Sequence, residues 1–349
     1  TLLNLASVEL SQGEYGRAEE LQNQAMQAAR QAYGDEHPLI ARILYAQSDL
    51  AAAREDEVEA ERLCVQSLEM RRRTRPADHP DIALSLRQLA RFRRSRDQGR
   101  EALALFREAL AIQQVHGESD YGACETILNL ATYEYMFGDI AKAEGLVREA
   151  MDKLTRLLGE DHPGVASAWS RLALMLTEQH RYEEALSWRK RVVAFDRANN
   201  RPDDRLGVSL REVGDLLNTL GRHTEAEPIL RESLRRLQAF FGDDHVNVCR
   251  SRASLGESLT HLGQYEEAER LLLDADRLWS AAYPASPQTR TMRLQLAALY
   301  QAINKPEHAA HWEAAAESRR PTSSTTPSAA RPQAPPTTQP DDVDASPDM

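Results

Sequence analysis

The sequence predicts an all-α protein, a right-handed superhelical α-solenoid of eight helix-turn-helix repeats. Two periodic patterns support this fold. Alanine recurs every 41 or 42 residues, and a large residue and then a small one follow it three and seven positions later. A second pattern, a mostly apolar residue followed by a small one, precedes each alanine. Offsets of three and four fall on one helix face, so each interval predicts helices that pack closely against neighbours.

The second helix of each repeat is marked by one alanine: Ala18, Ala60, Ala102, Ala143, Ala185, Ala226, Ala268 and Ala309. The first helix is marked by the pairs Leu5-Ala6, Gln47-Ser48, Leu89-Ala90, Leu130-Ala131, Leu172-Ala173, Val213-Gly214, Leu255-Gly256 and Leu296-Ala297. We call the first member of each pair the marker residue. One helix pair cannot bury its apolar face alone, so repeats of this kind stack into one continuous core.

The turns also recur. Eight residues after the marker stand Gly13, Glu55, Asp97, Gly138, His180, Gly221, Gly263 and Asn304, and glycine or asparagine there can adopt the left-handed conformation that ends a helix. Segments such as Gly159-Glu160-Asp161-His162-Pro163 separate the repeats. We expect their glycine to stop one helix, an acidic residue to cap the next, and proline to take the first helical position.

These motifs resemble the kinesin light chain type of tetratricopeptide repeat. The resemblance rests on the 42-residue spacing, the G-x-x-H-P segment, Leu128-Asn129-Leu130-Ala131 and Gly263-Gln264-Tyr265-Glu266-Glu267-Ala268-Glu269. It implies a protein-interaction scaffold with the first helices lining the concave side. The ending Lys305–Trp312 is also similar to the close of repeat arrays in bacterial serine/threonine kinases and nucleotide-binding regulators, which implies a non-catalytic regulatory part of a signalling protein.

We expect the solenoid to span residues 1–318 and a disordered tail, rich in Pro, Ser and Thr, to span residues 319–349. The chain opens at Thr1 without methionine and already in a helical pattern, so we expect it to be part of a longer protein. A net charge of −11 opposes nucleic acid and anionic membranes as partners. No stretch approaches the roughly 18 apolar residues of a membrane span. Three distant cysteines favour a reducing compartment, so a cytoplasmic location is expected.

No sequence signature of an enzyme is present. Phosphate-loop and kinase motifs are absent, and no pair of carboxylates is set apart for acid–base chemistry. Histidine recurs at His37, His79, His162 and His245 with the repeat. His308 and His311 lie three residues apart near the end, without a third clustered ligand. This spacing favours structural roles over metal ligation. We therefore expect no catalytic activity, no cofactor and no metal.

One segment differs in charge from the rest. From Arg71 to Arg107 there are eleven arginines and four acids. Three of these arginines form one stripe of the first helix of repeat three, and neighbouring repeats add tyrosine and polar residues to the same side. The predicted peptide-binding residues are Tyr45, Arg87, Arg91, Arg94, Asn129, Thr132 and Tyr135. Arginine and tyrosine dominate interface energetics, so we hypothesise a groove for an acidic segment of a partner protein.

Two interpretations of this segment stay open. The arginines either bind a partner, or form a solvated face paired with acids on adjacent repeats. For the whole chain, a scaffold that binds a protein or peptide is favoured over a regulatory part of a larger enzyme and over a spacer that binds nothing.

Overall fold

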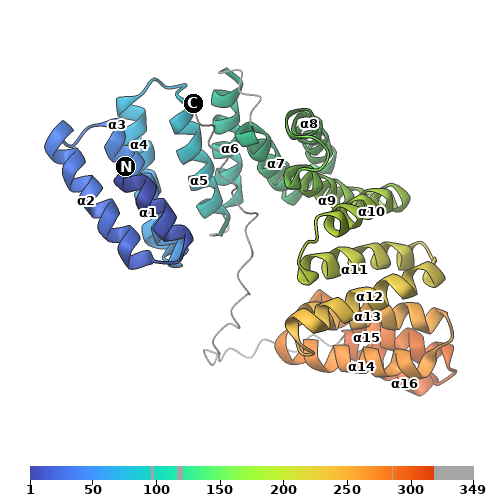
Figure 1. Cartoon of the computed structure of the whole chain (residues 1–349). Coiled ribbons are helices and arrows are strands. Elements are labelled where there is room, and N and C mark those ends of the chain that lie inside the picture. Colours follow the sequence, from blue (N-terminus) through green and yellow to red (C-terminus); the bar gives the residue numbers. More distant parts are fainter. Residues whose placement is uncertain (96–97, 116–120, 285, 318–349) are drawn as a thin grey trace. The chain divides into compact units, whose positions relative to one another are not determined.

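The computed structural model describes residues 1–95, 98–115, 121–284 and 286–317. Every regular element in these ranges is an α-helix, as Figure 1 shows. The first helices of the eight repeats are α1 (Leu2–Ser11), α3 (Pro38–Ala53), α5 (Pro80–Ser95), α7 (Tyr121–Met136), α9 (Pro163–Glu178), α11 (Asp203–Thr219), α13 (Val246–His261) and α15 (Pro287–Ala302). The second helices are α2 (Tyr15–Tyr33), α4 (Glu57–Thr74), α6 (Gly99–Val115), α8 (Ile140–Leu158), α10 (Tyr182–Ala198), α12 (His223–Phe241), α14 (Tyr265–Ala282) and α16 (Pro306–Glu317).

The chain divides into two compact units, Thr1–Met175 and the part from Leu176 onward. Within each unit a first helix packs on its own second helix, as α3 does on α4 and α11 on α12. The second helix then packs on the next first helix, as α4 does on α5 and α12 on α13. Consecutive first helices also touch, as in α1–α3 and α11–α13. This order of contacts confirms the predicted helix-turn-helix repeats.

The small residues of the repeat are the points of closest packing. Each recurring alanine from Ala18 to Ala268 is fully buried, and Ala309 is 3 % exposed. At some repeats the small residue that follows the marker of the first helix is glycine, and there is no room for a larger side chain. A Cβ built on Gly256 would lie 2.6 Å from Cγ of Leu272 on α14. Close helix–helix packing, as predicted from the sequence, therefore depends on these positions.

The turn inside each repeat is set by the fold more than by glycine. Gly138 has φ +89°, but Glu55, His180 and Asn304 occupy the same turn position with φ of +63°, +59° and +56°. The left-handed region is unfavourable for a side chain, so packing on both sides holds these residues there. Repeat two thus keeps its turn without the glycine. Asp97, the equivalent in repeat three, lies outside the described residues.

Histidine, not an acidic residue, caps the first helix of four repeats, so that prediction was wrong. The imidazole Nδ1 of His37, His79, His162 and His245 accepts a hydrogen bond from the backbone N–H two residues later, at 3.0–3.2 Å. The acid is one or more residues too early in the loop to reach this N–H. In two repeats the ring also stacks on an aromatic residue, as His245 does on Phe241 at 3.8 Å between centroids. The recurring histidines are therefore structural.

Histidine caps make folding sensitive to acid. Burial lowers the pKa of His162 and of His245, and a protonated Nδ1 can no longer accept the N–H. Their contribution is complete above the unfolded-state pKa of about 6.5 and is lost as the pH falls below it, because the unfolded chain binds protons first. Asparagine caps without titrating, so the His162→Asn/His245→Asn variant should lose less stability between about pH 7 and 5.

The expected difference is roughly 1–2 kcal/mol, from about 1 kcal/mol for each cap. Urea unfolding followed by circular dichroism at several pH values measures it. Parallel pH profiles for parent and variant would contradict the role assigned to these two rings.

The last repeat and the thiols complete the fold. Arg293, an arginine at an otherwise apolar position, binds Asp276 at 3.2 Å and donates to the carbonyl of Ala315 at 2.7 Å.

The predicted tail, residues 319–349, lies outside the described residues. All three cysteines, Cys64, Cys124 and Cys249, are buried. None of the helices within the described ranges is long and apolar enough to cross a membrane.

Candidate functional site

The predicted binding residues belong to three consecutive first helices of the first unit, α3, α5 and α7. Arg87 lies two residues before its marker, Leu89, and faces α7. Its guanidinium forms an ion pair with Glu125, five residues before the marker Leu130 on α7. Only 17 % of the Arg87 side chain is exposed, and its Nε is buried without a partner. Arg87 is thus neutralised within the chain by a carboxylate of α7.

Arg91, one turn further along α5, is different. Its side chain is exposed, and no hydrogen bond or ion pair joins it to any residue that the structure describes. The side chain of Arg94 lies outside the described residues. Arg91 is therefore the available cation of the predicted stripe.

Tyr45 on α3 is half-buried beneath another arginine. The guanidinium carbon of Arg71 lies 4.8 Å from the centre of the Tyr45 ring, and Arg71 also donates to the backbone carbonyl of Asp81. Burial first, and the Asp49 carboxylate second, raise the pKa of the Tyr45 hydroxyl. The hydroxyl stays neutral at physiological pH, and the ring supports Arg71 rather than standing free.

The α7 residues are partly engaged. Thr132 donates to the carbonyl of Leu128 at 3.0 Å and accepts from Arg171 on α9, which also donates to the Leu128 carbonyl at 2.9 Å. Tyr135 is half-buried and has a contact of its own. Asn129 is half-buried, and its amide makes no hydrogen bond to the described residues. Asn129 is thus the open hydrogen-bonding group of α7.

Most other arginines of the basic segment pair with acids of neighbouring helices. Examples are Arg72–Glu108 at 2.6 Å, Arg93–Glu61 at 2.9 Å and Arg107–Glu134 at 2.7 Å. These pairs follow the second of the two interpretations, a face paired across repeats. Glu125 and Arg171 were not among the predicted residues. Aligning the repeats on their markers puts Arg87 at position −2 and Glu125 at position −5, but that these two positions face each other is visible only in the structure.

Histidines and acids do not assemble into a metal site in the part of the chain that the structure describes. No group of three His, Cys, Asp or Glu side chains is close enough to hold an ion there. His308 lies against Tyr300 and His311 against Trp312, with ring centroids 5.1 and 5.4 Å apart.

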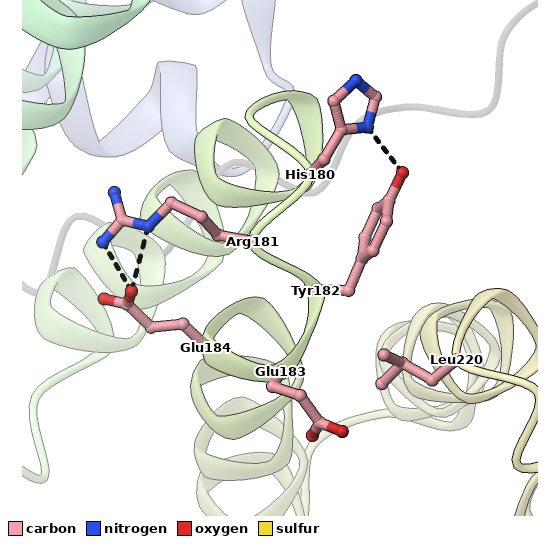
Figure 2. A pocket seen from close by; sticks show the side chains of 6 residues that line it. All are labelled: His180, Arg181, Tyr182, Glu183, Glu184 and Leu220. Atoms are coloured by element: carbon pink, nitrogen blue, oxygen red, sulfur yellow. Dashed lines mark hydrogen bonds and ion pairs between the residues drawn. The ribbon is translucent and has the colours of Figure 1, made fainter.

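A separate pocket of about 350 Å³ lies in the second unit, beside the turn that leads into α10 (Figure 2). Four of its polar side chains form two facing pairs. The His180 ring bonds the Tyr182 hydroxyl at 2.6 Å, and Arg181 binds Glu184 at 2.5 Å. Glu183 pairs with Arg222 at 3.3 Å. The pocket is open to solvent and its charges are already satisfied, so it is a poorer candidate than the first-helix face.

Together, the repeated helix pairs define a helical-repeat fold of the kind typical of protein-interaction scaffolds and sensors. The tetratricopeptide repeat model matches residues 1–73, 81–156, 122–198 and 205–278, more than half of the sequence. The chain belongs to the tetratricopeptide repeat family. Folds of this kind commonly bind protein or peptide partners and are generally non-catalytic scaffolds or sensors.

Solved structures share the fold at low sequence identity. A Pyrococcus horikoshii signal-transduction ATPase of the STAND class with a tetratricopeptide repeat sensor is 16 % identical, with a TM-score of 0.64, and the match covers 89 % of this chain and 44 % of that one. The apo quorum sensor NprR from B. thuringiensis is 12 % identical, with a TM-score of 0.59 over 90 % and 96 % of the two chains. Kinesin light chain-like repeats from Podosopora anserina are 22 % identical, with a TM-score of 0.50 over 57 % and 95 %.

Curated relatives match over a shorter stretch. Clustered mitochondria protein homologs of Aspergillus niger and Emericella nidulans are each 24 % identical over 127 residues, which is 36 % of this chain. The chain spans only about a tenth of the length of these relatives. They are fungal, and the bacterial, kinase-linked setting suggested by the sequence resemblance finds no support in them.

Proposed function

We propose that this protein is an interaction scaffold whose first-helix face, on α5 and α7, binds an extended acidic segment of a partner protein. The single observation that supports it most is Arg91, an exposed arginine without an ion pair to the described residues, although Arg72, Arg73, Arg87, Arg93 and Arg107 all have acidic partners. A partner carboxylate would give Arg91 the charge-assisted hydrogen bond that its neighbours already have.

Asn129 supplies the second element of the proposed site. A half-buried amide without a hydrogen bond gains when a ligand provides both a donor and an acceptor. The backbone of an extended segment offers both groups at every residue. The Arg87–Glu125 ion pair joins α5 to α7, the two helices that carry Arg91 and Asn129.

Arg91→Glu and Asn129→Ala are the variants that test this proposal. A random peptide library displayed on phage is selected on the immobilised full chain. We expect the parent to enrich peptides containing Asp or Glu, and each variant to bind the enriched peptides about tenfold or more weakly. Arg277→Glu is the matched control, because Arg277 is exposed on α14, a second helix, and its one ion pair among the described residues is with nearby Asp274 at 3.5 Å.

Circular dichroism should first show unchanged helicity in all three variants. Absence of acidic enrichment on the parent, or equal binding by the parent, Arg91→Glu and Asn129→Ala, would overturn the proposal. The former result would favour a spacer that binds nothing.

A second candidate is a sensor region within a larger signalling protein. The fold shared with the Pyrococcus sensor-containing ATPase supports it, because the match covers less than half of that protein. On this candidate the same face would receive the signal-bearing segment. Sequencing the gene upstream of the Thr1 codon would decide it, since a kinase or nucleotide-binding domain there carries recognisable motifs.

A further inference from the structure

The equivalent of the Arg87–Glu125 pair in the second unit consists of two arginines. Arg211 on α11 lies two residues before the marker Val213, as Arg87 does before Leu89. Arg250 on α13 lies five residues before the marker Leu255, as Glu125 does before Leu130. The residue that neutralises the facing arginine in the first unit is thus itself cationic in the second.

Arg211 forms an ion pair with a residue of its own helix, although its Nε is buried without a hydrogen-bond partner. Its side chain is 4 % exposed, and its guanidinium binds Asp215 at 2.5 Å, while the other Asp215 oxygen accepts from Ser254 at 2.5 Å. The remaining acid, Glu212, binds Arg189 at 2.7 Å and is 4.0 Å from Arg211. Each carboxylate near Arg250 is therefore engaged by another cation.

Arg250 is left as the uncompensated charge. It is half-buried on α13, and no hydrogen bond or ion pair to its guanidinium occurs among the described residues. Burial, and then the positive charge of Arg211, lower its pKa, an effect that Asp215 and Glu212 only partly oppose. A half-desolvated cation beside a second cation costs stability, and charges that cost stability are characteristic of binding sites.

We propose that Arg250, backed by the buried Arg211, forms a second anion-recognition site that binds a carboxylate of an acidic protein segment. It extends the proposed function to the second unit but rests on its own residues. The carboxylate would supply the negative charge that Glu125 supplies in the first unit. One turn further along α13, Ser254 is a polar neighbour whose hydroxyl donates to the backbone carbonyl of Arg250 at 3.1 Å.

Arg250→Gln should raise the thermal stability of the protein and weaken its binding of acidic peptides. We expect Arg250→Gln to raise the Tm by about 1–3 °C, because it removes the like-charge contact. The matched variant Glu125→Gln, at the equivalent position of the first unit, should lower the Tm because it breaks a formed pair. A fall in Tm for Arg250→Gln would mean that the guanidinium is satisfied within the chain, and would overturn the proposal.

Binding is tested with four full-length proteins: the parent, Arg91→Glu, Arg250→Gln and the double variant. Each is used to select the phage-displayed random peptide library, and the enriched acidic peptides are then titrated by fluorescence anisotropy. We expect Arg250→Gln to weaken binding about tenfold, whether or not Arg91 is present. Exchanging one Asp or Glu of the peptide for Asn or Gln should have the same effect on the parent and none on Arg250→Gln.

The four proteins separate the two proposals. Loss of acidic enrichment on Arg91→Glu alone would support the first-unit site and overturn the one at Arg250. Loss on Arg250→Gln alone would do the reverse. No acidic enrichment on the parent would overturn both.

Discussion

Gly214→Ala is expected to lower the free energy of unfolding of the second unit by about 2–3 kcal/mol, although alanine normally favours a helix. Gly214 lies on α11, where an added Cβ would stand 2.3 Å from Cδ2 and 2.4 Å from Cγ of Leu230 on α12. Leu230 is fully buried, so it cannot swing away without displacing its neighbours. The clash outweighs the roughly 1 kcal/mol of helix propensity gained.

Gly145 on α8 is the matched control. A Cβ there meets nothing within 4 Å, and the residue is exposed. Gly145→Ala should therefore raise the free energy of unfolding by up to about 1 kcal/mol. Urea unfolding monitored by circular dichroism measures both variants. Equal signs for the two substitutions would contradict the close α11–α12 packing. Adding Leu230→Ala to Gly214→Ala should cost less than the sum of the two single changes, because each relieves the other.

Arg205→Ala should destabilise the same unit by about 3 kcal/mol, an effect much larger than that of an ordinary surface arginine. Arg205 donates through Nε to the carboxylate of Asp196 at 3.1 Å, and this side chain is completely buried. The second carboxylate oxygen accepts from Ser209 at 2.8 Å. Removing the guanidinium leaves a buried negative charge with one hydroxyl as its partner, and the desolvation of that charge is no longer offset.

Substituting the other partner, Asp196, tests whether the pair matters more to the buried carboxylate than to the partly exposed guanidinium. Arg205 is 37 % exposed, so in Asp196→Ala its guanidinium can turn to water, and the loss should be smaller than in Arg205→Ala. Arg277→Ala removes a surface pair and should leave the unfolding curve unchanged. Thermal and urea unfolding of the three variants rank their losses of stability. A smaller loss for Arg205→Ala than for Asp196→Ala would show that Asp196 does not depend on this partner.

The fold was predictable because its determinants repeat. A period of 41 or 42 residues places Ala60 and Ala226 in the same surroundings, so each position is supported by seven others. The turn at Glu55 was harder to predict from the sequence, because its left-handed conformation is imposed by packing on either side and not by the residue itself. The capping role of His162 was missed for a local reason: acids are commoner helix caps, and the loop contains both residues.

The candidate site was less predictable. The stripe through Arg87 and Arg91 follows from helical spacing, but whether each arginine is free depends on residues about 38 positions away, such as Glu125. Long side chains can reach several partners, so charge alone does not decide the pairing. The contrast between Arg87 and Arg250 appears only when the neighbouring helices are set side by side.

The buried cysteines have a consequence for chemical reactivity. Burial raises the pKa of the Cys64 thiol to about 12 and also raises that of Cys249, so these two thiols carry almost no thiolate in the folded protein at neutral pH. Thiolate is the form that oxidants and alkylating agents attack. Modification must therefore wait until the surrounding repeat opens. Because Cys64 lies in the first unit and Cys249 in the second, each unit contains a thiol whose rate of modification reports its own local opening.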